Sequence, residues 1–322
     1  MSELLKNIDA RTRLAGTNKL EILLFTLGVD ARSGCRETYG INVFKVREVM
    51  RRPTITAAPD MPEAVQGMVS LRGALVPVVD LGRYVGVGED APREIMIVTE
   101  YNGHTQGFLV EGVDTILRLD WSQMRVPPEM LTARLGGLVT AVTSLADGRL
   151  VMMLDVERVL SETSRYDDAF LFRDIAPLPG ADAHVVYFAD DSSVARRQIS
   201  QTLDAMGLRH VGAVNGRQAW EELCRVATRA EAAGRKVGDF VSLVLTDVEM
   251  PEMDGFMLTR QIKADRRFAG IPVIMHSSLS GTSNRQLGLS VGVDEYVSKF
   301  EPQRLSQVLT RLLGMGDTAT GR

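Results

Sequence analysis

Apolar and polar residues alternate along this chain in two different ways, and the change falls near its middle. In the first half, apolar residues gather in short runs that suit β-strands. These runs cover residues 20–27, 39–44, 65–81, 94–101, 105–110, 113–119, 138–145 and 150–154, and a short helical run follows at 155–160. Three turn dipeptides interrupt the runs, namely Arg72-Gly73, Asn102-Gly103 and Asp147-Gly148. The pattern predicts three β-hairpins within an all-β barrel or sandwich.

In the second half, apolar runs alternate with segments of helical periodicity. The apolar runs cover residues 184–189, 241–245, 271–275 and 293–297, and the helical patterns cover residues 194–206, 217–233, 257–268, 284–291 and 303–313. Strands that alternate with helices are typical of βαβ units with right-handed crossovers. Because the five helical patterns separate five strands, the second half is predicted to be an α/β fold with a doubly wound, five-stranded parallel sheet.

Chemically active side chains stand at the ends of these predicted strands. In chain order they are Asp190, Asp191, Asp247, Ser277 and Lys299. Because the carboxyl ends of parallel strands meet at one edge of a sheet, these side chains are expected in one crevice. A single Asp at a strand end is more often a helix cap than a nucleophile, but the company of the other residues reverses that expectation.

Three carboxylates in one crevice cannot all stay ionised without a cation. Hard oxygen ligands with open positions suit Mg²⁺, which retains water and bridges to phosphoryl groups. Lys299 and the Ser277 hydroxyl would hold the remaining phosphoryl oxygens. Asp247 is then the candidate nucleophile, which would form an acyl phosphate.

Residues 183–314 resemble the response-regulator receiver domain, which has the CheY-like fold. The resemblance rests on MPEMDG after Asp247 and, at the family's spacing, on Asp190, Asp191, Asp247, Ser277, Tyr296 and Lys299. It implies that Asp247 is the phosphoacceptor. It also implies that Asp191 and Asp247 bind Mg²⁺ directly, while Asp190 acts through water and Glu249 through its backbone carbonyl.

The same resemblance implies roles for the remaining residues of the crevice. Lys299 would stabilise the phosphoryl group, and Ser277 and Tyr296 would form the hydroxyl–aromatic switch pair. The sequence departs from the family at two positions. Phe300 follows Lys299 where the family usually has a proline in a cis peptide. Glu249 adds a carboxylate at a position that tunes dephosphorylation, and its charge would hinder the attacking water and favour a long-lived signal.

Residues 18–162 resemble the coupling domain CheW, a family that builds two small intertwined β-barrels and links chemoreceptors to the histidine kinase CheA. The matching stretches are LLFTLG at 23–28, YGINVFKVREV at 39–49, GMVSLRGALVPVVDL at 67–81 and GVDTIL at 112–117. The resemblance implies that four positions contribute to receptor or kinase contact: Val46, Glu48, Gly67 and Arg72.

Other interpretations of these four residues stay open. Arg72 on a hairpin turn is a planar donor fork that suits an interface, although a solvated turn residue is the alternative. Core packing for Val46 and a backbone turn for Gly67 are nearly as well supported as interface contact. Glu48 alone would be interpreted as a solvated strand residue.

A connecting segment at residues 161–183 carries a charged run, two prolines and a glycine, which is typical of a linker. The apolar residues within 170–175 are unlike a flexible tether, so we expect them to pack on one domain and couple the two halves. The expected organisation is a coupling domain at 1–165, a linker at 166–183, a receiver domain at 184–316 and a disordered tail at 317–322.

Charge and composition narrow the function further. The chain holds 37 Lys+Arg against 41 Asp+Glu, and neither half is basic, which argues against a nucleic-acid-binding module. The two cysteines and four histidines lack the spacing of a metal site or a disulfide framework. No signal peptide or apolar run of transmembrane length occurs. A cytoplasmic protein without membrane insertion is expected.

The order of a CheW-like domain and then a receiver resembles the CheV family of chemotaxis coupling proteins. This implies an adaptor, rather than an enzyme, that couples methyl-accepting chemoreceptors to CheA at membrane-associated arrays, with coupling tuned by phosphorylation of Asp247. One alternative is a phosphate sink that drains CheA with little effect on coupling. A transcriptional regulator would need a basic helix-turn-helix, and a metal-dependent phosphatase would turn over external phosphate esters.

Overall fold

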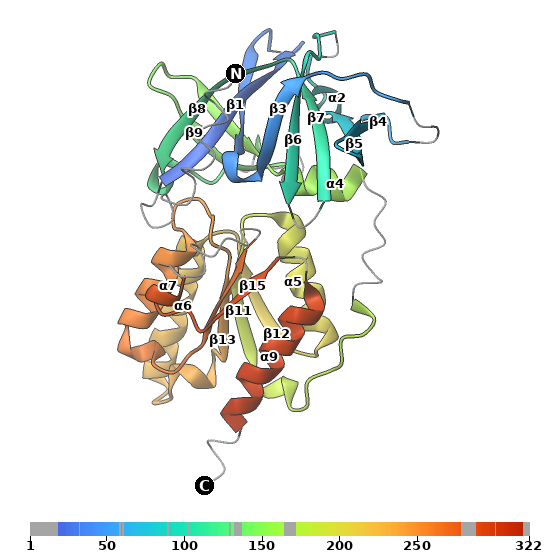
Figure 1. Cartoon of the computed structure of the whole chain (residues 1–322). Coiled ribbons are helices and arrows are strands. Elements are labelled where there is room, and N and C mark those ends of the chain that lie inside the picture. The colour runs from blue at the N-terminus through green and yellow to red at the C-terminus, as the bar shows by residue number, and fades with distance from the viewer. Residues whose placement is uncertain are drawn as a thin grey trace. The chain divides into compact units, whose positions relative to one another are not determined.

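A computed structural model describes residues 19–31, 33–57, 59, 61–88, 90–101, 104–128, 130–131, 137–163, 172–277, 288–299 and 301–317. The chain folds as two compact units, Met1–Arg165 and Tyr166–Arg322, and each is described by itself (Figure 1). Phe300, residues 170–171 and most of the helix predicted at 284–291 lie outside the described residues. No helix in the described part of the chain is long and apolar enough to cross a membrane.

The first unit is built from two five-stranded sheets, and the strands of one sheet come from two separate parts of the chain. The first sheet has the order β8 (Gly112–Asp120), β1 (Lys19–Val29), β2 (Arg36–Asn42), β10 (Leu150–Leu154) and β9 (Val139–Ser144). The second has the order β3 (Val46–Arg51), β6 (Ile95–Tyr101), β7 (His104–Val110), β5 (Ala74–Asp80) and β4 (Val65–Leu71). The chain begins the first sheet, forms the whole second sheet, and then returns to complete the first. The three predicted hairpins are confirmed as β4–β5, β6–β7 and β9–β10.

Each of these sheets closes on itself through a single β-bridge. Thr56, in the segment after edge strand β3, pairs with Met68 on β4, the opposite edge of the same sheet. Arg125, in the segment after edge strand β8, likewise pairs with Val142 on β9. The predicted pair of small β-barrels is thus confirmed.

Strand β1 is apolar on both faces because it serves two cores. Phe25 and Leu27 lie in a core shared by the two sheets, whereas Ile22 and Leu24 lie in a second core that belongs to the first sheet alone. Successive side chains of a strand point to opposite faces, so a continuous apolar run was the expected sequence pattern for such a strand. Helix α4 (Val156–Thr163) covers the shared core.

Strand β3 and helix α2 (Leu81–Val85) are among the elements of this unit that were not predicted. Strand β3 has the sequence VREVMR, whose charged residues hid its strand pattern. Helix α2 is too short to show a helical period. It is defined by its ends, because the Asp80 side chain accepts a hydrogen bond from the backbone N–H of Arg83 and Gly86 ends the helix in the left-handed conformation.

The buried side chain of Arg93 joins the two sheets. Its Nε donates to Asp80 Oδ1 at 2.7 Å beside β5, and its Nη1 donates to the Leu27 carbonyl on β1 at 3.0 Å. Its Nη2 donates to the Gly88 carbonyl at 2.7 Å. A Cβ at Gly82 would lie 2.0 Å from Arg93 Nη2, so this glycine leaves the room that the guanidinium occupies.

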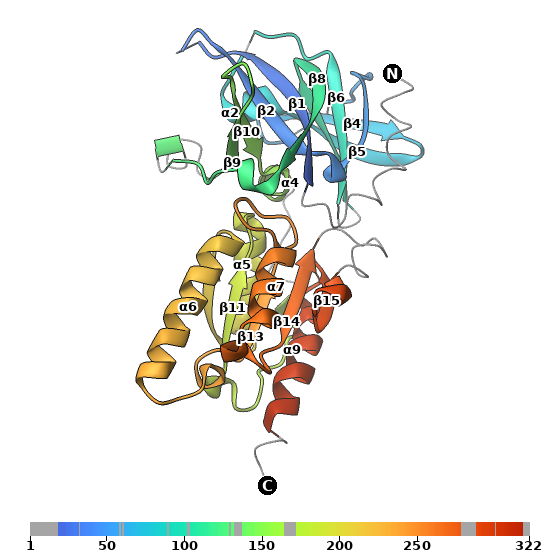
Figure 2. The ribbon, with the colours of Figure 1, turned by 90° about the vertical axis from the view of Figure 1, so that its left-hand side faces the viewer.

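The second unit has one parallel sheet with helices on both faces (Figure 2). The strand order is β12 (Arg209–Ala213), β11 (Val185–Ala189), β13 (Leu243–Thr246), β14 (Val273–Ser277) and β15 (Glu295–Ser298). Helices α5 (Ser193–Ala205) and α9 (Pro302–Asp317) pack on one face, and α6 (Gly216–Ala232) and α7 (Gly255–Ala264) pack on the other. The predicted doubly wound, five-stranded parallel fold is confirmed.

Part of the connecting segment belongs to this second unit. Ile175 and Leu178 are buried in the core beneath α5 and α9, and Phe172 packs against the same core. The backbone N–H of Leu178 donates to the carbonyl of Met206 at the end of α5, at 2.9 Å. The prediction that apolar residues of this segment pack on one domain is confirmed for Phe172 and Ile175.

Arg93→Met should lower the free energy of unfolding of the first unit by about 3 kcal/mol or more, because it leaves the Asp80 carboxylate without its buried cation. Arg93→Lys should restore only part of the loss, since lysine lacks the planar donor fork. Urea unfolding followed by the fluorescence of Trp121, in a Trp220→Phe background, measures this unit alone. Arg52→Met, at an exposed position, is the control, and an unchanged midpoint in Arg93→Met would contradict the role of Arg93.

Candidate phosphoryl and metal site

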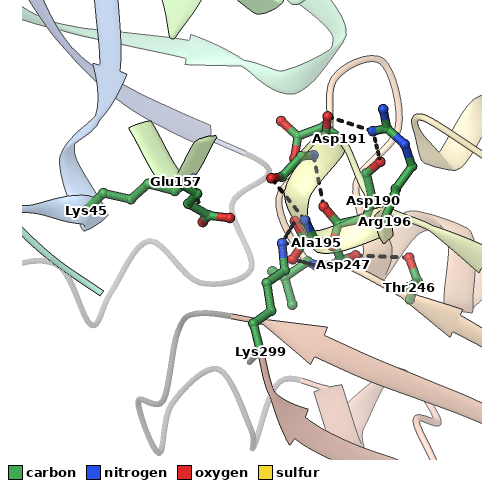
Figure 3. A network of polar contacts seen from close by, with 11 residues as sticks. Lys45, Glu157, Asp190, Asp191, Ala195, Arg196, Thr246, Asp247 and Lys299 are labelled. Carbon is green, nitrogen blue, oxygen red and sulfur yellow. Dashed lines mark hydrogen bonds and ion pairs between the residues drawn. The ribbon is translucent and has the colours of Figure 1, made fainter. Parts of the chain in front are cut away.

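The receiver sheet brings the predicted site residues to one edge. Asp190 follows β11, Asp247 follows β13, Ser277 ends β14 and Lys299 follows β15. All neighbouring strands are parallel, so these carboxyl ends meet at the same edge, where ligands bind in open α/β sheets. Figure 3 shows Lys299 extending toward Asp190 and Asp247.

Lys299 forms two buried ion pairs. Its Nζ lies 2.8 Å from Asp190 Oδ2 and 2.9 Å from Asp247 Oδ2. Asp190 is 0% exposed, Lys299 3% and Asp247 4%. Removing such charges from water costs several kcal/mol per ion, and their attraction often fails to recover it. An arrangement this costly is typical of a functional site rather than of a structural one.

The carboxylates of this edge fit a divalent cation. Asp190, Asp191 and Asp247 each offer an oxygen, and these oxygens lie within 4.8 Å of one another. Burial raises the pKa of Asp247 well above its usual value, Lys299 opposes that rise, and the charges of Asp190 and Asp191 add to it. A hard cation with oxygen ligands, as Mg²⁺ is, would relieve both the burial and the repulsion.

Asp247 is not a helix cap. The cap of the following helix, α7, is Asp254, whose side chain accepts from the N–H of Met257 at 2.6 Å. Asp247 Oδ1 instead accepts from the N–H of Val248 at 2.7 Å. The capping role that a lone Asp at a strand end would most often have is therefore filled by Asp254. Asp247 instead contacts Lys299 in the crevice.

The loop after Asp247 allows no side chain at its glycine. A Cβ at Gly255 would lie 2.0 Å from the carbonyl oxygen of Asp247, and the Gly255 N–H donates to the carbonyl of Val248 at 3.0 Å. The same loop carries Glu252 at φ 65°. Its carboxylate lies 3.5 Å from Arg217 Nε at the start of α6. The sequence MPEMDG thus forms a compact loop that fixes the backbone of Asp247.

Ser277 and Tyr296 are brought together beside the carboxylates. Their side chains form a hydrogen bond, which lowers the pKa of Tyr296, but burial is the larger effect and raises that pKa to about 12. The charges of Asp247 and Glu249 raise it further. The Tyr296 side chain therefore lies close enough to Asp247 for the Asp247 charge to affect its pKa.

Arg196 belongs to this site, although the sequence analysis did not identify it. Its Nη1 donates to the backbone carbonyls of Asp190 and Asp191 at 2.8 Å each (Figure 3). The only signal in the sequence was its place in the first turn of the helix after these two residues. Backbone carbonyls leave no pattern in a sequence, so this contact became visible only in the fold.

In the first unit, Arg72 and Glu48 lie at the surface and contact each other. Arg72 and Gly73 have φ 50° and 85° and form a two-residue turn between the paired residues Leu71 and Ala74. Arg72 Nη2 lies 3.0 Å from Glu48 Oε2, with the arginine side chain 70% exposed. The pair spans from the β4–β5 turn to β3, across the closure of the second barrel.

The residue types at positions Val46 and Gly67 are explained by packing and by backbone conformation. Val46 is 7% exposed and lies in the shared core. Gly67 has φ 132°, and a Cβ there would lie 2.1 Å from the carbonyl oxygen of Thr56, beside the bridge that closes the barrel. The role of these two residues in an interface stays a prediction.

Comparison with known proteins assigns both units. Residues 21–164 match the model of the CheW-like domain, and residues 186–310 match that of the response regulator receiver domain. The first unit is also similar to the scaffolding protein TtCheW from Thermoanaerobacter tengcongensis, at 28% identity and a TM-score of 0.37 over 42% of this chain and 88% of that one. The class of protein is a chemotaxis signalling protein in which a CheW-like coupling domain is joined to a receiver.

Several relatives match both units of the chain, and two of them illustrate the similarity. Chemotaxis protein CheV1 of Helicobacter pylori is 27% identical over 97% of this chain and 99% of its own length. Chemotaxis protein CheV3 of the same organism is 30% identical over 85% of this chain and 88% of its own length. The chain belongs to the CheV family of chemotaxis proteins.

Asp247→Asn should raise the free energy of unfolding of the receiver unit by about 1 kcal/mol or more at neutral pH in EDTA, because it removes an excess buried charge. The folded pKa of Asp247 is raised, so its ionisation opposes folding. The unaltered chain is expected to lose stability as the pH rises from about 4, the ordinary Asp pKa, toward this raised value. The extra stability of Asp247→Asn over the unaltered chain should therefore vanish at low pH, where Asp247 is protonated. It should also become smaller in Mg²⁺, because a bound cation would offset the charge of Asp247.

Urea unfolding followed by the fluorescence of Trp220, in a Trp121→Phe background, checks this expectation. Asp182→Asn, at an exposed position of the same unit, is the matched control and should change little. A variant at Asp247 that is less stable than the unaltered chain in EDTA at neutral pH would show that the carboxylate is a structural partner of Lys299 rather than an excess charge.

Proposed function

We propose that this protein couples chemoreceptors to the histidine kinase CheA and that phosphorylation of Asp247 modulates this coupling. The observation that carries the proposal is the cluster of the buried Asp190, Asp247 and Lys299 with the half-buried Asp191, in the same chain as a CheW-like domain. A chain that only linked two partners would have no need for such a costly arrangement. We propose an adaptor without substrate turnover, located in the cytoplasm at receptor arrays.

Asp190, Asp191 and Asp247 would hold Mg²⁺, together with the backbone carbonyl of Glu249. The bound ion would neutralise charge on the carboxylates and on the incoming phosphoryl group. An Asp247 oxygen would form the new bond to phosphorus as the bond to the kinase's phosphorylated residue breaks. Lys299, already 2.9 Å from Asp247, would then pair with a phosphoryl oxygen.

The readout would pass through Ser277 and Tyr296. A phosphoryl group adds about two negative charges and three strong acceptors. The Ser277 hydroxyl would donate to it and give up its hydrogen bond with Tyr296. Tyr296 would then be free to change its position on β15, which packs against α9, and so alter the surface of the receiver.

In the coupling domain, the exposed side chain of Arg72, paired with the half-buried Glu48, is the part of the proposed interface that is open to a partner. Arg72 presents a planar donor fork on a rigid turn. Val46 and Gly67 would contribute by shaping the strands that carry this pair. We propose CheA and chemoreceptors as the partners of this surface, with no nucleic acid.

Incubation with CheA that carries labelled phosphate should transfer the label to the unaltered chain in Mg²⁺ and not to Asp247→Ala, because Asp247 would be the acceptor. The amount of protein that co-sediments with receptor-containing membranes should change with labelling. Asp182→Ala, which precedes the amino end of β11 and so lies away from the carboxyl ends of the strands, is the control and should be labelled normally.

Each outcome of this experiment separates the candidates. Labelling that requires Asp247 and changes co-sedimentation supports the regulated adaptor. Labelling that changes neither co-sedimentation nor kinase output favours the phosphate sink. No labelling would leave a coupling protein whose receiver is only a scaffold.

Arg72→Ala and Gly67→Ala should have different effects. Arg72 is exposed, so its replacement should change the free energy of unfolding by less than about 0.5 kcal/mol while it reduces co-sedimentation with receptor membranes. Gly67→Ala should cost more than about 1 kcal/mol, because alanine disfavours this backbone conformation. Unchanged co-sedimentation of Arg72→Ala would remove this residue from the interface.

A further inference from the structure

Arg196 lies in the first turn of α5, where a positive charge does not stabilise the helix. A cation at a helix N-terminus is unfavourable with respect to the helix dipole. Helical side chains lean toward the N-terminus, and this one reaches back over the loop that precedes the helix. There its Nη1 donates to the carbonyl oxygens of Asp190 and Asp191, at 2.8 Å each. Two charge-assisted hydrogen bonds offset the cost of the position.

These two bonds fix consecutive peptide groups of the loop that carries the acidic pair. The same loop is held from its other side, because the N–H of Ser192 donates to Asp190 Oδ1 at 2.9 Å. Ser192 in turn caps α5 by accepting from the N–H of Ala195. With both peptide groups fixed, the direction in which each of the two side chains leaves the backbone is set before any ligand arrives, and one carboxylate oxygen of Asp190 is held as well.

Mg²⁺ makes this precision important. The ion demands near-ideal octahedral geometry, so carboxylates that are free to turn would bind it more weakly. Residues that orient metal ligands without touching the metal typically account for about a 10–100-fold difference in affinity. Arg196 has the contacts required for such a residue.

We infer that Arg196 is a positioning residue for the cation site, and that it sets the affinity for Mg²⁺ by holding the backbone of Asp190 and Asp191. The inference rests on the proposed function, because it concerns the same site. It goes further by assigning the affinity of that site to a side chain that is not itself a ligand.

Calorimetric titration of the full chain with MgCl₂ tests the inference. Arg196→Met should raise the dissociation constant for Mg²⁺ about tenfold or more. Arg196→Lys, which keeps the charge but lacks the planar fork, should fall between Arg196→Met and the unaltered chain. Arg197→Met is the matched control, because this neighbouring arginine is exposed, and its dissociation constant should stay within about twofold of the unaltered value.

A merely structural role for Arg196 would lower stability without changing the affinity of the folded protein. Urea unfolding in EDTA is therefore measured alongside, and titrations are made where each variant is folded. If Arg196→Met does not fold, Arg196→Lys decides, and a dissociation constant equal to that of Arg197→Met overturns the inference. If the unaltered chain binds no Mg²⁺, the metal part of the proposed function falls together with this inference. Normal binding by the unaltered chain and by both Arg196 variants would overturn the inference alone.

Discussion

Three carboxylates and one ammonium share a small space at the edge of the receiver sheet, and this imbalance of charge governs what surrounds them. Burial and the neighbouring acids raise the pKa of Asp247, and Lys299 offsets only part of the effect. The folded chain therefore carries a cost that a divalent cation would remove. Such a cost can persist only where the backbone leaves the carboxylates no escape to solvent. The crowding at Gly255 and the two bonds from Arg196 provide that restraint.

The coupling unit depends on a different constraint, since each of its barrels is too small to bury much apolar surface alone. The two barrels share a core, and the chain forms the whole second sheet between the two parts of the first. Arg93 adds hydrogen bonds between the sheets, from Asp80 on one side to the Leu27 carbonyl on the other. The resulting frame is rigid enough to display Arg72 on a two-residue turn, in contact with Glu48. The exposed Arg72, the half-buried Glu48 and the buried Val46 and Gly67 thus belong to one barrel.

The two units have separate cores, and the described residues of the segment between them pack on the receiver. Phe172 and Ile175 pack in the core that also holds Val297 of β15 and Leu309 of α9. The described part of the connection, from residue 172 on, is therefore an extension of the receiver, on the face that includes α9. A rearrangement that begins at Tyr296 would act on elements that already contact this extension. The proposed modulation could therefore begin at Tyr296 and pass through the packed core of the receiver to the connecting segment.

Local patterns in the sequence determined much of this protein. Turn dipeptides such as Arg72-Gly73 located the hairpins, because few residues adopt positive φ, and the alternation of strands and helices placed Asp247 and Lys299 at one edge of a parallel sheet. Only the tertiary structure decided how the barrels close and which charged side chains are buried. Strand β3 is polar in sequence, and Arg93 and Arg196 bond mainly to backbone carbonyls. Backbone carbonyls are present at every residue, so the sequence cannot tell which of them folding will bring within reach of an arginine.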